Sequence, residues 1–118
     1  MDYIVKKVTS LGIPGLILII VMAVSGLKGA AALTFTLAVL GGPFGMLGGL
    51  AVLGIIGLIS HSFAKYGVEK IVEAVIRENL KTKTPDEILK EIEKYPISKD
   101  MKLKMQEYIT RISNKNDK

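Results

Sequence analysis

The residue whose type and setting most suggest chemistry is Lys28, an isolated charge in a long apolar stretch. It is the one charged side chain between Lys7 and His61. An ionisable group at membrane depth would line a pore, contact an anion or pair with another charge. The alternative is a lysine at the far interface that extends to lipid headgroups. Its place between Gly26 and Gly29, where a turn is expected, favours this alternative.

His61 is the only histidine, and the sequence contains no cysteine. A metal site needs several His, Cys or carboxylate ligands together, so we interpret His61 as a residue at the membrane interface rather than a ligand or pH sensor. No Ser–His–Asp set, no Gly-Lys-Ser/Thr phosphate loop and no carboxylate pair within the apolar stretch can be recognised. The sequence therefore predicts a protein that is not an enzyme and holds no cofactor or metal.

Glycines form the clearest spacing pattern, Gly41-x-x-x-Gly45-x-x-x-Gly49, with Gly48 beside it. A four-residue spacing places glycines on one helix face, where a second helix can approach closely in lipid. We expect these four glycines to form an interface between copies of the chain. The alternatives are helix packing within one chain, or no special role in a segment simply rich in glycine.

Met101, Met105 and Tyr108 recur at helical spacing near the C-terminus. Flexible methionines beside tyrosines suit an adaptable partner-binding surface, but residues at this spacing more often form a core, which we favour. A nearby basic cluster is interpreted as a solvated face rather than an anion site, and it comprises Lys99, Lys102, Lys104 and Arg111.

The elements that must position these residues begin with three apolar runs, over 13–27, 30–40 and 44–62. A helix needs about 20 residues to cross a bilayer. The first and third runs are predicted to cross, with a short intramembrane or interfacial helix between them. In an alternative hairpin, the second crossing begins near Ala30 and kinks at Pro43. The fold class is therefore all-α, with residues 1–64 as a transmembrane region.

Residues 65–118 are predicted to form a cytosolic helical tail. Apolar residues at helical spacing indicate a helix over 66–79 that continues the last crossing. Thr84-Pro85-Asp86-Glu87 is typical of a capped helix start, and Ser98 would cap a last helix.

The distribution of charge predicts the orientation of the chain in the membrane and argues against nucleic acid as a partner. The net charge is +5, but the segment from His61 onward mixes both signs. This mixture favours a solvated surface near anionic lipid over nucleic-acid binding. Basic residues before the first crossing and after the last predict that both termini are cytoplasmic.

The segment from Gly41 to Gly49, followed by Lys65-Tyr66-Gly67 and Tyr95-Pro96-Ile97-Ser98-Lys99, resembles small glycine-rich, glycine-zipper-like bacterial membrane proteins with a helical cytosolic tail. The resemblance covers most of the chain. It implies a multi-pass protein of the bacterial inner membrane and brings no assigned activity.

Glycines spaced for association between helices, a small helical tail and the lack of a catalytic motif together predict an oligomeric integral membrane protein. It would form a pore or disrupt the membrane as a toxin or an antiviral defence effector, regulated by its tail. The alternative is a membrane anchor or scaffold whose tail docks a cytosolic protein. Expected partners are the lipid bilayer, other copies of the chain and that cytosolic protein.

Overall fold

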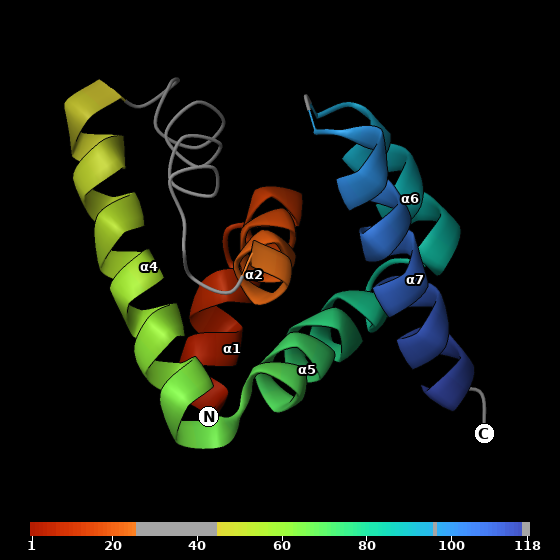
Figure 1. Cartoon of the computed structure of the whole chain (residues 1–118), viewed down its shortest axis with the longest axis horizontal. Coiled ribbons are helices and arrows are strands. Elements are labelled where there is room, and N and C mark those ends of the chain that lie inside the picture. Colours follow the sequence, from red (N-terminus) through yellow and green to blue (C-terminus); the bar gives the residue numbers. More distant parts are fainter. Residues whose placement is uncertain (26–44, 96, 117–118) are drawn as a thin grey trace.

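The computed structural model describes residues 1–25, 45–95 and 97–116, and this part of the chain contains six helices and no strand (Figure 1). The predicted all-α class is therefore confirmed. In chain order the helices are α1 (Asp2–Thr9), α2 (Ile13–Ser25), α4 (Gly45–Tyr66), α5 (Val68–Leu80), α6 (Pro85–Glu93) and α7 (Lys99–Asn116). Lys28, Gly41 and the short helix predicted over 30–40 lie outside the described residues.

Two glycines with positive φ set the direction of the chain. Gly12 (φ 75°) joins α1 to α2, and Gly67 (φ 94°) is the single residue between α4 and α5. Only glycine adopts this backbone region without a steric penalty. The predicted continuous helix from the last apolar run into 66–79 is therefore wrong, because Gly67 ends α4 and α5 leaves in a new direction.

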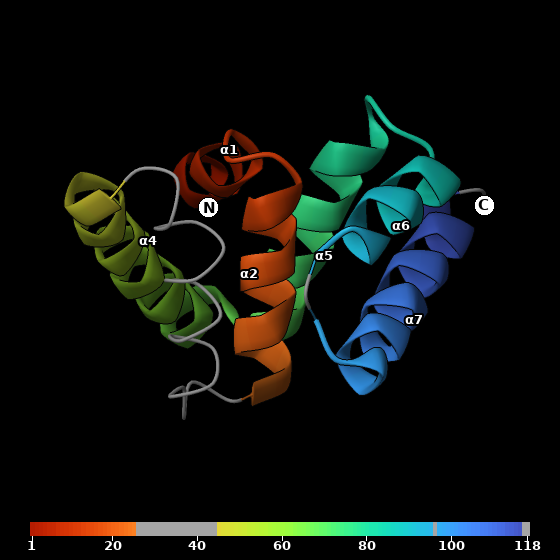
Figure 2. The same ribbon diagram turned by 90° about the horizontal axis from the view of Figure 1, so that it is seen from above.

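Helix α2 lies at the centre of the molecule, as the view from above shows (Figure 2). It packs against α1, α5, α6 and α7, while α4 packs against α5 and α1. Every side chain from Leu16 to Met22 is at most 5% exposed, so α2 is buried on all sides. A helix that is apolar all round must be covered in this way, by protein or by lipid.

The amphipathic helices α5, α6 and α7 pack against α2. Each buries one apolar stripe and leaves its charged face outside. The stripes of α5, α6 and α7 are Ile71, Val72, Val75 and Ile76, then Ile88 and Ile92, then Met105, Ile109 and Ile112. Residues from both sides of the predicted boundary at 64/65 thus share one hydrophobic core.

No helix in the described part of the chain has both the length and the apolar character needed to cross a membrane. This finding contradicts the predicted membrane hairpin and the multi-pass inner-membrane location with cytoplasmic termini. The first predicted crossing is the short helix α2, Ile13–Ser25. Its length is about two thirds of the thickness of a hydrocarbon core. Helices α1, α5, α6 and α7 of the same chain pack against its apolar surface.

Candidate functional site

The candidate site is built on the hairpin of α6 and α7, and its first element is the cap that starts α6. Thr84 Oγ1 accepts a hydrogen bond from the Glu87 backbone N–H (3.2 Å), and Glu87 Oε1 accepts one from the Thr84 N–H (3.1 Å). This capping box, with Pro85 in the first turn, confirms the predicted helix start. The hydrogen bond from the Thr84 backbone is the main cause of a lowered pKa of the Glu87 carboxyl.

Helix α7 runs back along α6 after a short loop. Ser98 Oγ accepts from the Met101 N–H (3.2 Å) at its start. Lys102 fixes the two helices at this end, because its Nζ donates to the backbone oxygen of Glu93 (3.1 Å) and lies 3.4 Å from Glu93 Oε2. A lysine at the last carbonyls of α6 also complements the negative end of that helix dipole.

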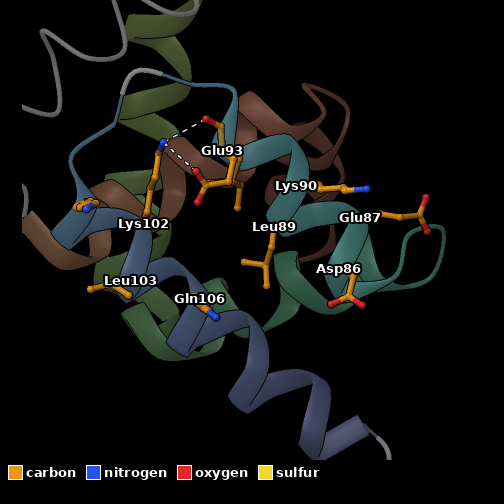
Figure 3. A pocket seen from close by; sticks show the side chains of 10 residues that line it. Asp86, Glu87, Leu89, Lys90, Glu93, Lys102, Leu103 and Gln106 are labelled. Atoms are coloured by element: carbon orange, nitrogen blue, oxygen red, sulfur yellow. Dashed lines mark hydrogen bonds and ion pairs between the residues drawn. The ribbon is translucent and has the colours of Figure 1, made fainter.

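Between α6 and α7 lies an open groove with a volume of about 940 Å³ (Figure 3). Its lining comes from both helices and comprises Asp86, Glu87, Leu89, Lys90, Ile92, Glu93, Lys99, Lys102, Leu103 and Gln106. Leu103 is 57% exposed and lies off the buried stripe of its helix. A leucine this open, beside a hollow that the half-buried Leu89 also lines, is an apolar surface without cover from the described residues.

The charges of the groove are balanced but separated along its length. Three acids and three lysines line it. Asp86 and Glu87 lie at one end, and Lys102 and Glu93 lie at the other, with Leu89 and Gln106 between them (Figure 3). Glu93 is paired with Lys102, so the remaining Lys99 makes that end positive. At the other end, Lys90 offsets only part of the negative charge of Asp86 and Glu87.

The predicted tail residues lie on the other side of α7. Met105 is buried in the core, and Met101 and Tyr108 pack against it. The Tyr108 hydroxyl donates to Glu69 Oε1 on α5 (2.9 Å), and Arg111 Nη2 lies 3.2 Å from Glu69 Oε2. The pKa of Tyr108 is raised, mainly by the partial burial of its hydroxyl and further by the contact with the Glu69 carboxylate.

The other predicted residues are not brought to this groove. Gly45, Gly48 and Gly49 lie in the first turns of α4, where the surroundings of residues 45–53 are outside the described part. His61 is exposed near the end of α4. Among the described residues, no group of three or more His, Asp or Glu side chains is arranged to hold a metal ion.

Sequence reasoning missed the pair of Leu103 and Leu89 as a surface. The available signal was the position of Leu103, one apolar residue between Lys102 and Lys104 and out of step with the stripe of Met101 and Met105.

Comparisons with protein-family models, with curated proteins and with solved structures find no match to this chain.

Proposed function

We propose that this chain is a non-enzymatic docking protein, a scaffold whose α6–α7 hairpin receives a helix of a protein partner in its groove. The observation that carries the proposal is the 57% exposure of Leu103 at a groove with Leu89 and Gln106 in its middle and charged side chains at its ends. The pore-forming alternative depends on helices that cross a membrane, and no described helix supplies one. Partner docking has no such requirement.

A helix suits the groove because two packed helices leave a channel between their ridges. Helical partners place apolar side chains at i, i+3, i+4 and i+7 into such grooves. Helix α6, Pro85–Glu93, forms one wall and makes between two and three turns. The groove therefore accommodates a helical segment of similar length. Leu89 and Leu103 would contact the apolar stripe of the partner, and the charged ends would fix its direction.

The size of the apolar contact limits the expected affinity. Full burial of a leucine contributes about 1.5–3 kcal/mol, so covering the exposed part of Leu103 contributes roughly 1–1.5 kcal/mol. A micromolar complex needs about 8 kcal/mol. Leu103 alone is insufficient, and the rest must come from Leu89, the margins of the groove and its charged ends. We therefore expect a weak, reversible complex.

A designed peptide provides a test that does not require the natural partner. The probe is a helical peptide with leucines at i, i+3, i+4 and i+7, lysines at one end and glutamates at the other. Titrated into the labelled full chain, it should shift NMR signals of residues 86–93 and 99–106. A scrambled peptide with the same composition should not.

Leu103→Ala should weaken the binding of this peptide, and Leu58→Ala is its matched control. Leu58 is an exposed leucine on α4, outside the groove. If Leu58→Ala weakens binding as much as Leu103→Ala, or if the shifts spread evenly over the chain, the groove is not a docking site.

A further inference from the structure

We propose that the corner where the start of α1 meets the end of α4 binds the surface of a bilayer that contains anionic lipid. This inference goes beyond the proposed docking function, because it concerns a second surface, away from the α6–α7 groove. The contact lies on the bilayer surface and requires no helix to cross it. Two features carry the inference: an unequal distribution of acids along the chain, and exposed apolar side chains beside lysines.

The acidic residues are concentrated in one part of the chain. Between Asp2 and Glu69 the sequence has no aspartate or glutamate, but it has four lysines. Three of these lysines lie on α1 and α4 and are exposed, namely Lys6, Lys7 and Lys65. All acids except Asp2 therefore lie from Glu69 onward. Charge asymmetry of this kind between two parts of a chain is typical of proteins that bind membranes or nucleic acids.

Contacts between α1 and α4 bring the three lysines to one corner. The two helices pack against each other, and the Met1 nitrogen lies 3.3 Å from the Tyr66 hydroxyl. Lys65 Nζ lies 5.2 Å from the centre of the Tyr66 ring. Because α1 has only eight residues, Lys6 and Lys7 lie within about two turns of this junction.

The acids at the two limits of this region leave the corner positive. The Glu69 carboxylate accepts a hydrogen bond from Tyr108 (2.9 Å) and pairs with Arg111 (3.2 Å), both on α7. Asp2 offsets one of the three lysine charges. The remaining positive charge attracts anionic lipid headgroups.

Exposed apolar side chains accompany the lysines on both helices. Tyr3 is 66% exposed and shares the outer face of α1 with Lys6 and Lys7, since positions i, i+3 and i+4 are neighbours on a helix. Leu58 is 37% exposed and lies about two turns before Lys65 on the outer face of α4. Tyrosine is enriched where a membrane meets water, because its ring is apolar and its hydroxyl is polar.

A lipid surface fits this corner better than a nucleic acid does. Lysines attract the phosphates of either partner. Tyr3 and Leu58, however, gain from losing contact with water only against an apolar partner, which the boundary between headgroups and acyl chains supplies. Helices α6 and α7 lie at the other end of the molecule from α4 (Figure 1 and Figure 2). The groove therefore stays open when the corner is bound to lipid.

Co-sedimentation of the full chain with vesicles tests the charge requirement. The chain should bind vesicles of equal parts phosphatidylcholine and phosphatidylserine, and should bind phosphatidylcholine alone much more weakly. Lys6→Gln and Lys65→Gln should each weaken binding about fivefold, the usual contribution of one lysine near an anionic surface. Lys104→Gln, at an exposed lysine of α7, is the matched control and should bind as the original chain does.

Tryptophan fluorescence tests which surface touches the lipid. The sequence has no tryptophan, so Tyr3→Trp and Leu103→Trp each introduce a single fluorophore. The mixed vesicles should shift the emission of Tyr3→Trp to shorter wavelengths, because the indole leaves water, and should not shift that of Leu103→Trp. Circular dichroism of every variant should show the helical content of the original chain.

Four outcomes would overturn the inference. The first is a chain that does not bind the mixed vesicles, or that binds phosphatidylcholine alone equally well. The second is an equal loss of binding in Lys104→Gln and Lys65→Gln. The third is an emission shift for Leu103→Trp with none for Tyr3→Trp, which would assign the lipid contact to another surface. The fourth is tighter binding of duplex DNA than of the mixed vesicles, which would make nucleic acid the partner.

Discussion

Thr84 and Glu87 form the reciprocal pair of hydrogen bonds that begins α6, and therefore one side of the groove. The pKa of the Glu87 carboxyl lies below its ordinary value of 4.5, because the Thr84 backbone N–H stabilises the carboxylate. A carboxyl whose folded-state pKa is lowered stabilises the fold above its unfolded pKa. That contribution is lost as the pH falls through the folded-state pKa.

Glu87→Gln should therefore make the unfolding free energy less sensitive to acid. An amide can still accept the hydrogen bond from Thr84, but it does not gain a proton in the acid range where the Glu87 carboxyl does. The measurement is the thermal midpoint from about pH 6 to about pH 3. Glu107→Gln, on the exposed face of α7, is the control; an equal change of slope in both variants would contradict the role of Glu87.

Gly15 and Gly57 are both helical glycines, yet their surroundings differ. A Cβ at Gly15 would overlap the backbone oxygen of Val8 and lie 2.9 Å from Leu11 Cβ, whereas a Cβ at Gly57 would meet nothing within 4 Å. Gly15 therefore permits the close approach of α2 to the end of α1.

Alanine at these two positions should change stability in opposite directions. Gly15→Ala should destabilise the chain by about 1–3 kcal/mol, since backbone must move to relieve the overlap. Gly57→Ala should stabilise it by about 0.5–1 kcal/mol through the loss of glycine freedom in the unfolded chain. Urea unfolding measures both. The same sign for both would show that α1 and α2 do not pack as described.

Helices α5 and α7 are joined on their outer edge by polar contacts that converge on Glu69, with Tyr108 and Arg111 as its partners. Arg111 also lies over the Tyr108 ring, 4.9 Å from its centre. This seam holds the back of α7 against α5, so that the opposite face of α7 is presented to the groove.

Tyr108→Phe tests the seam. It should lower stability by about 0.5–1 kcal/mol through the lost hydrogen bond. The pKa of Tyr108 is raised above its ordinary value of 10.0. Its contribution is therefore present below that value and lost as the pH rises through the folded-state pKa. The variant should lose less stability between about pH 9 and about pH 11 than the original chain.

Tyr3→Phe is the control for this alkaline slope. Tyr3 lies on the exposed side of α1, so its replacement should leave the slope unchanged. If Tyr3→Phe flattens the slope as much as Tyr108→Phe, the slope does not arise from Tyr108.

Across the whole molecule, the sequence predicted the capped start of α6 and the apolar stripes of α5 and α7, because local hydrogen bonding and periodicity set those features. It did not predict where α2 would be buried. A helix that is apolar on every face has no periodicity to distinguish a protein interior from lipid, and only the combined stripes of its neighbours decide the matter. Leu103 was missed for a related reason, since one residue out of step with a stripe carries no period of its own.

The central position of α2 predicts large effects of truncation there. Ile19 is fully buried. Ile19→Ala should therefore lower the unfolding free energy by about 2–5 kcal/mol. Leu58→Ala, on the exposed side of α4, should cost much less. Denaturant unfolding of the two variants measures the difference, and equal costs would contradict a fold organised around α2.

The docking groove is tested most directly by the accessibility of position 103. The chain has no cysteine, so Leu103→Cys and Leu58→Cys each create a single reporter thiol. The rate of thiol labelling at position 103 should fall when the designed peptide is added, while the rate at position 58 stays constant. A labelling rate at position 103 that the peptide does not change would contradict a docking function for the α6–α7 groove.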